Sequence, residues 1–132
     1  MMKNHKMILL IAVLLLCGGC VARVKEGLRG IAGVSTKVLE DNLSGAITKE
    51  FNLDYNTAYF KAKEVLKNIK AYIYAIEDSK NLIAVYVSEI DTTPVGIFFK
   101  GLDKAKTQVQ VSSPSTYAKE LIAGKLFAGM EK

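Results

Sequence analysis

The sequence predicts a two-layer α+β domain in which two helices pack on one face of an antiparallel β-meander of four to five strands. Apolar and β-branched runs follow one another with only short turn segments between them, which is typical of antiparallel strands. Helical apolar periodicity occurs twice, before the first of these runs and after the last. Half of the 132 residues are apolar, which is enough to form one hydrophobic core.

The domain is expected to begin near Ala46 with a strand, because Ile47, Phe51 and Leu53 would share one side of an extended segment, together with Lys49. A helix follows from Tyr55 to about Asn68, since Asp54 is a favoured cap and an apolar face repeats every three to four residues.

Four strand-like runs come next, and short turns favour their pairing in sequence order. The predicted strands are 71–77, 82–90, 95–100 and 107–111, and the predicted turns are 78–81, 91–94 and 101–104. In the last run, apolar residues alternate with lysine and glutamine, which indicates a strand with one solvated face.

Ser113 and Pro114 predict the start of a final helix, because serine is a favoured cap and proline is favoured at the first helical position. This helix is expected to reach nearly to Lys132. Its predicted buried side comprises Tyr117, Leu121, Ile122, Phe127 and Met130. The predicted order is therefore β-α-β-β-β-β-α.

Residues 1–19 have the composition of a cleaved secretory signal: a short positive segment, an apolar run at 7–16, and two glycines before Cys20. As a helix the apolar run would span about 15 Å, half of a hydrocarbon core of about 30 Å, so a permanent span is disfavoured.

The residues around Cys20 resemble the lipobox of bacterial lipoproteins, although Cys17 occupies the position where leucine is usual. The resemblance implies cleavage between Gly19 and Cys20, acylation of Cys20, and a membrane anchor. Because Val21 follows the cysteine, it also implies the periplasmic face of the outer membrane in a diderm cell. After cleavage Cys20 has no cysteine to pair with in an oxidising compartment. The alternative is an ordinary signal peptide that contains two cysteines.

Residues 20–45 are expected to form the lipidated N-terminus and a tether, and residues 46–132 the single domain. Glycines at 27, 30, 33 and 45 weaken a helical stripe in the tether. A short helix is expected near residues 36–42, with Ser35 as a cap. An amphipathic helix lying on the membrane through Arg23, Lys25 and Arg29 is the alternative.

From residue 7 to the C-terminus the chain resembles small bacterial lipoproteins of unknown function. They share a lipobox, a glycine-containing tether and a β-α-β-meander-α domain. The segments that resemble them are GVSTKVLE, IYAIEDSKNLIAVYVSEIDTTPVGIFF and VSSPSTYAKELI. The resemblance implies an envelope lipoprotein and no particular chemistry.

No catalytic group, cofactor or metal site is expected. The only histidine, His5, lies in the leader, so the mature chain lacks the usual general base near neutral pH and the commonest metal ligand. Acylation of Cys20 would remove thiol chemistry as well. The acidic pairs Glu77–Asp78 and Glu89–Asp91 are typical of solvated hairpin ends, and Glu89 and Asp91 supply too few oxygen ligands for calcium.

The formal charge is +5, and without the leader 16 basic and 13 acidic side chains remain. Their interleaving favours a solvated surface over a nucleic-acid site.

Two segments are candidate interaction sites. Asp91, Thr92, Thr93 and Pro94 would present a rigid, hydroxyl-rich loop, with a plain turn as the alternative. Ser113, Ser115 and Thr116 surround a helix N-terminus, where backbone N–H groups attract anions, although capping alone also accounts for Ser113.

The expected function is that of a lipid-anchored envelope module that binds another envelope protein or has a structural role. The alternative is a small-ligand-binding lipoprotein with a tyrosine-lined pocket between helices and sheet. A dry, filled interlayer would favour the first hypothesis.

Overall fold

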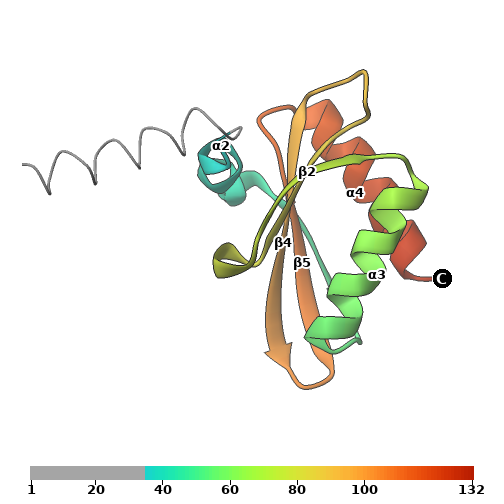
Figure 1. Cartoon of the computed structure of the whole chain (residues 1–132). Helices are drawn as coiled ribbons and strands as arrows, with labels where there is room; N and C mark the ends of the chain where they lie inside the picture. Colours follow the sequence, from blue (N-terminus) through green and yellow to red (C-terminus); the bar gives the residue numbers. More distant parts are fainter. Residues whose placement is uncertain (1–34) are drawn as a thin grey trace, which may run out of the picture. The chain divides into compact units, whose positions relative to one another are not determined.

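The structure, a computed structural model, describes residues 35–132, shown in colour in Figure 1. The predicted signal peptide, Cys20 and the first part of the tether lie outside the described residues. Residues 36–132 form one compact unit. Within the described range, no helix is long and apolar enough to cross a membrane.

Five antiparallel strands form one sheet in the order β1-β5-β4-β3-β2. Their bounds are Ile47–Phe51 for β1, Tyr72–Glu77 for β2, Leu82–Tyr86 for β3, Pro94–Asp103 for β4 and Lys106–Ser112 for β5. Strands β2 to β5 form the predicted meander. Strand β1 pairs with β5, so the first strand of the domain lies beside the last.

Two long helices, α3 (Tyr55–Asn68) and α4 (Thr116–Met130), cover one face of this sheet (Figure 1). The predicted α+β architecture and element order are thereby confirmed. The capping of α3 is also as predicted, because the Asp54 carboxylate accepts a hydrogen bond from the backbone N–H of Thr57.

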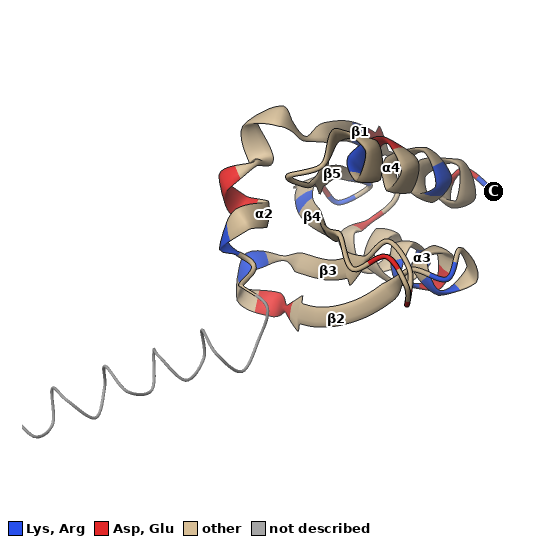
Figure 2. Ribbon diagram, turned by 90° about the horizontal axis from the view of Figure 1, so that it is seen from above, with Lys and Arg blue, Asp and Glu red and all other residues tan. Residues whose placement is uncertain are grey.

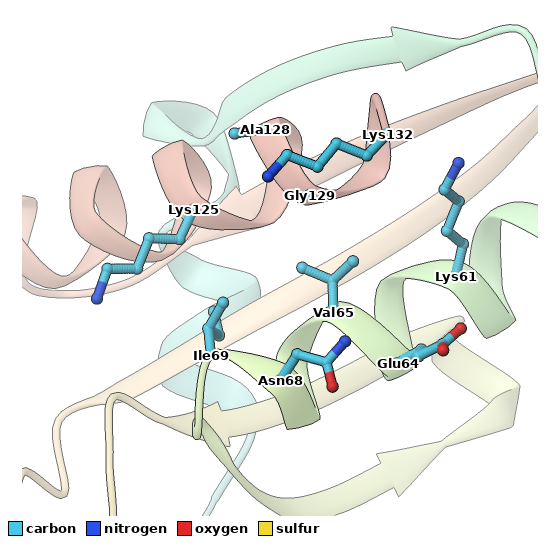
Figure 3. A pocket seen from close by; sticks show the side chains of 9 residues that line it. All are labelled: Lys61, Glu64, Val65, Asn68, Ile69, Lys125, Ala128, Gly129 and Lys132. Atoms are coloured by element: carbon cyan, nitrogen blue, oxygen red, sulfur yellow. The ribbon is translucent and has the colours of Figure 1, made fainter.

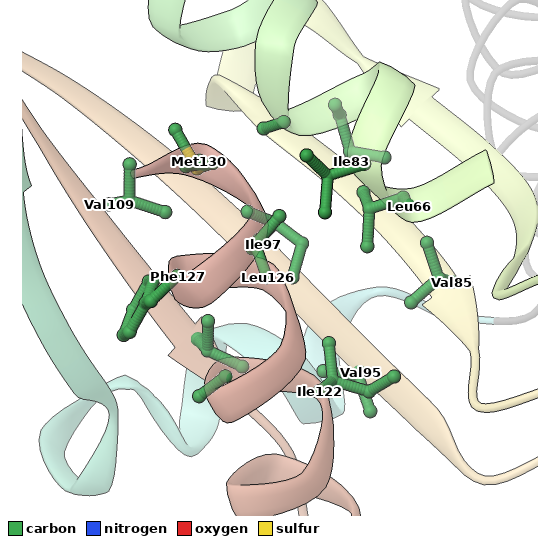
Figure 4. Packing of buried hydrophobic residues seen from close by; sticks show 14 of the residues in the cluster. Leu66, Ile83, Val85, Val95, Ile97, Val109, Ile122, Leu126, Phe127 and Met130 are labelled. Atoms are coloured by element: carbon green, nitrogen blue, oxygen red, sulfur yellow. The ribbon is translucent and has the colours of Figure 1, made fainter. Parts of the chain in front are cut away.

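The main core lies between the helices and the sheet (Figure 4). Strand residues that point toward the helices are almost fully buried, and so are the small and branched residues that α3 and α4 direct back at them. The largest of these side chains belong to Leu66, Ile83, Val85, Val95, Ile97, Val109, Val111, Ile122, Leu126 and Met130.

A third element covers part of the opposite face. Helix α2 (Lys37–Asp41) and the 3₁₀ turn η1 (Leu43–Gly45) precede β1. Leu39 of α2 is 0% exposed and forms a second apolar cluster with Leu82, Ala84 and Phe98. A Cβ atom on Gly96 would lie 3.0 Å from two carbons of Leu39, so a side chain at this position would require Leu39 to shift by a few tenths of an ångström. Figure 2 shows α2 across the strands from α3 and α4.

The short helix predicted near residues 36–42 is confirmed, and it packs on the sheet rather than belonging to a free tether. Its predicted cap is wrong: Thr36, and not Ser35, is the N-cap residue, and its side chain makes no capping hydrogen bond. That hydroxyl lies near the Glu77 carboxylate instead, 3.3 Å from each oxygen.

Two strand boundaries differ from the prediction by more than two residues. Strand β3 ends at Tyr86 instead of residue 90, because Ser88 and Asp91 close a local turn. Strand β4 continues to Asp103 through an irregularity after Gly101, so the turn to β5 contains only Lys104 and Ala105.

The predicted start of the last helix is also wrong. Ser115 caps α4 by accepting a hydrogen bond from the N–H of Ala118, and the helix begins at Thr116. Tyr117 is 70% exposed rather than buried, whereas Ala118, Ile122 and Phe127 contact the core.

Helices α3 and α4 come into close contact where Gly129 faces Val65. A Cβ atom on Gly129 would lie 2.5 Å from a methyl carbon of Val65, whereas one on Gly124 would meet no atom within 4 Å. Valine is branched at Cβ and nearly rigid in a helix, so it cannot move aside cheaply.

We therefore expect Gly129→Ala and Gly124→Ala to have opposite effects on the free energy of unfolding. Gly124→Ala should stabilise by about 1 kcal/mol through helix propensity. Gly129→Ala should destabilise by about 1–2 kcal/mol, because overpacking outweighs the same gain. Urea denaturation measures both. Equal stabilisation by the two substitutions would contradict the close helix contact.

Candidate functional site

The loop that contains Asp91, Thr92 and Thr93, and that ends at Pro94, the first residue of β4, is partly exposed and is held by its own polar groups. The Ser88 hydroxyl accepts hydrogen bonds from the N–H groups of Ile90 and Asp91, at 3.2 and 2.9 Å. The Asp91 carboxylate accepts from both the N–H and the hydroxyl of Thr93. These bonds lower the pKa of Asp91 below its usual value. The loop therefore has a defined shape, with Ile90 projecting from it at 96% exposed.

The serines at the start of α4 use their hydroxyls within the fold. Ser113 Oγ donates to the carbonyl of Pro94 at 2.7 Å and accepts from the N–H of Ser115. Ser115 Oγ accepts from Ala118, as described above. The hydroxyls of Ser113 and Ser115 are therefore both used in hydrogen bonds within the fold. Of the three predicted residues, only Thr116 makes no capping bond and no bond to Pro94. This arrangement favours the capping interpretation of the segment over the anion-site interpretation.

The bond between Ser113 and Pro94 brings the two predicted interaction segments together. Nineteen residues separate them in sequence, yet the end of the 91–94 loop adjoins the start of α4. Nothing in the local sequence pattern predicts this contact, because it depends on how the sheet pairs.

A groove runs between the exposed sides of α3 and α4 (Figure 3). It has a volume of about 560 Å³, and the lining residues are Lys61, Glu64, Val65, Asn68, Ile69, Lys125, Ala128, Gly129 and Lys132. Within residues 35–132, none of its three lysines forms an ion pair. Val65 and Gly129, which approach each other closely between the two helices, both line the groove.

A second recess, of about 570 Å³, lies between the end of α3 and the loop after β3. Its apolar side is formed by Tyr72 and Ile90, and its polar side by Lys67, Lys70, Ser88 and Glu89. Both concave surfaces lie outside the helix–sheet interface, in which the described side chains are packed and almost fully buried.

Three tyrosines gather on the sheet face that α2 leaves partly uncovered. An irregularity between Ile73 and Ala75 inserts one additional residue, Tyr74, into the edge strand β2. The Tyr74 and Tyr86 rings stack with centroids 4.2 Å apart, and Tyr72 stacks on Tyr86 at 6.1 Å. The described part of the tyrosine-rich surface is thus a stacked group, and it does not line a cavity between the layers.

The Tyr74 hydroxyl oxygen is buried and has no hydrogen-bond partner among the described residues. Burial is the main cause that raises the pKa of Tyr74 to about 12, and the nearby Tyr86 and Glu77 add to the shift. The folded protein therefore keeps this proton at pH values where the unfolded chain loses it. The associated stability is present below pH 10 and decreases as the pH rises toward 12.

An ion-pair cluster attaches α2 to the hairpin between β2 and β3. Lys80 Nζ lies 2.6 Å from Glu40 and 3.2 Å from Glu77, and it also contacts the Thr36 hydroxyl at 3.4 Å. Hydrogen bonds to Glu40 and Glu77 raise the pKa of Lys80. On the other side of α2, Ser112 Oγ donates to the carbonyl of Leu39 at 2.6 Å. Sequence reasoning missed this cluster, since its members come from separate segments.

Among residues 35–132, no group of three acidic, histidine or cysteine side chains is arranged to hold a metal ion. Comparison with known proteins gives no family: neither a protein-family model nor a curated protein matches this chain.

The unpartnered Tyr74 hydroxyl gives a direct prediction. Tyr74→Phe should leave the free energy of unfolding unchanged or raise it by up to about 1 kcal/mol, because no hydrogen bond is lost. Tyr55→Phe is the matched control, since the Tyr55 hydroxyl donates to Asn81 at 2.8 Å. It should cost about 0.5–1 kcal/mol. A larger loss for Tyr74→Phe than for Tyr55→Phe in urea denaturation would contradict this account of the tyrosine group.

Proposed function

We propose that this protein is a lipid-anchored module of the cell envelope that binds or supports another envelope protein and catalyses no reaction. The observation that carries the proposal is the leader-like segment followed by Cys20, the only cysteine after residue 19. Acyl chains on Cys20 would attach the protein to a membrane leaflet, because two or more chains give stable anchoring.

The folded part is suited to attachment through its N-terminus. Helix α2 lies in the last part of the proposed tether segment, and Leu39, the Ser112 bond and the Lys80 ion pairs hold it to the sheet. A mechanical force applied to the chain before residue 36 would therefore be transmitted through α2 to strands β3, β4 and β5. This connection supports an anchor-and-display role, in which the tether positions a domain of defined shape.

Exposed surfaces of defined shape are available for a partner. The 88–94 loop has internal hydrogen bonds, adjoins the start of α4 and exposes Ile90 almost completely. A surface that is ordered before binding loses little conformational entropy on association. The packed helix–sheet interface supports this proposal over the alternative of a ligand pocket between the layers.

Intact mass spectrometry of the membrane-extracted protein tests the anchor. We expect a chain that starts at Cys20 and carries acyl mass, and we expect Cys20→Ala to abolish both cleavage at this position and the added mass. Cys17→Ala is the matched control, because Cys17 precedes the proposed cleavage site and should leave the product unchanged.

An unacylated product cut at another position would overturn the lipoprotein proposal. So would a loss of acyl mass in Cys17→Ala together with its retention in Cys20→Ala, because acylation would then occur on the other cysteine.

A further inference from the structure

A shallow recess at the N-terminal end of α3 combines aromatic rings with a carboxylate. It has a volume of about 270 Å³ and is lined by Tyr55, Asn56, Tyr59, Phe60, Asp78 and Asn81. The Tyr55 and Tyr59 rings are nearly parallel, at 11° and 6.4 Å between centroids. Phe60 meets Tyr59 at 83° and is 64% exposed. The rings therefore form an open aromatic corner.

The corner is held in place by the core. Tyr55 and Tyr59 both pack edge-on against Phe99, which is nearly fully buried, with centroids 6.2 and 5.4 Å away. The Tyr55 hydroxyl donates to the Asn81 side chain, and the Asn81 carbonyl accepts from the N–H of Phe99. Asn81 itself has a left-handed φ of 53°, which asparagine tolerates better than most residues. Because the rings are already ordered, binding in the corner requires little rearrangement.

Asp78 carries the only charged side chain among the residues that line the recess. Asp78 is exposed and forms no ion pair with any residue between 35 and 132, whereas the nearby Lys80 is engaged by Glu40 and Glu77. Burial is the main cause that raises the pKa of Tyr55 and Tyr59, and the charge of Asp78 adds to the shift of both. The carboxylate is therefore close enough to act on both rings. Aromatic faces are themselves negative, so the two groups favour the same kind of ligand.

We propose that this recess binds the cationic end of an arginine side chain presented by a partner protein. Asp78 would pair with the guanidinium group, which would pack against the rings of Tyr59 and Phe60. The volume is smaller than that of most small-molecule pockets but sufficient for one side chain. Arginine fits better than lysine because its planar group both stacks on rings and hydrogen-bonds a carboxylate. Binding in this recess does not depend on how the N-terminus is anchored.

NMR titration of the full chain with the peptide acetyl-Gly-Arg-Gly-amide tests the proposal. The full chain includes the apolar N-terminal segment, so the titration is done in detergent. This detergent must be non-ionic and free of ammonium groups, because such groups would compete for the site. We expect shifts of the Phe60 and Asn81 signals, with an affinity about tenfold higher than that of the same peptide with citrulline, which has a similar shape but no charge. Asp78→Asn and Phe60→Ala should each weaken binding about threefold. Both positions are exposed, so the fold should be retained.

Glu120→Gln is the matched control, because Glu120 is an exposed carboxylate on α4, which contributes nothing to the recess. It should leave the affinity unchanged. Equal binding of the citrulline peptide would overturn the proposal, and so would an affinity insensitive to Asp78→Asn. Tighter binding of tetramethylammonium than of the arginine peptide would also overturn it, by assigning the corner to a small quaternary cation.

Discussion

The structure depends on a constraint in its two central strands: β3 and β4 are apolar on both faces. Ile83 and Val85 point to one side and Leu82 and Ala84 to the other, and all four are almost fully buried. Water must therefore be excluded from both faces of the sheet at this point. Helices α3 and α4 exclude it from one face, and the short helix α2 does so from the other. Gly96 makes the second contact close, because it has no side chain beneath Leu39.

This constraint links the folded domain to its proposed anchor. The segment that covers the second face is also the segment that leads back toward the N-terminus, so the sheet and the tether share one attachment point. Helix α2 covers only part of that face, and the stacked tyrosines of β2 and β3 occupy the region beside it. Because α2 and the tyrosines cover this face of the sheet, the surfaces available to a partner lie elsewhere. They are the loop at 88–94, the groove between α3 and α4, and the aromatic corner near Asp78.

Features that depend on neighbouring residues could be predicted from the sequence. The helix after Asp54 was predicted with both ends correct, because capping and apolar periodicity are local. Features that depend on distant residues were missed. Ser113 has the sequence context of a cap, but its hydroxyl bonds to Pro94, and Ser115 takes the capping role. Tyr117 was predicted to be buried because it continues the apolar pattern of the last helix. That pattern does not show which side of the helix faces the core, and Tyr117 is exposed. The close contact of Leu39 in α2 with Gly96 joins two segments that lie far apart in the sequence. No local pattern indicates that the two predicted interaction segments adjoin, because the bond between Ser113 and Pro94 depends on the pairing of the sheet.

The most direct test of this account is the stability of Leu39→Ala, measured by urea denaturation beside Leu66→Ala. Both leucines are fully buried. Leu66 belongs to α3 and packs on one face of the sheet, whereas Leu39 belongs to α2 and packs on the opposite face. If both faces must be covered, each substitution should lower the free energy of unfolding by about 2–5 kcal/mol. A loss below about 0.5 kcal/mol for Leu39→Ala, with the usual loss for Leu66→Ala, would show that α2 is dispensable and contradict the account.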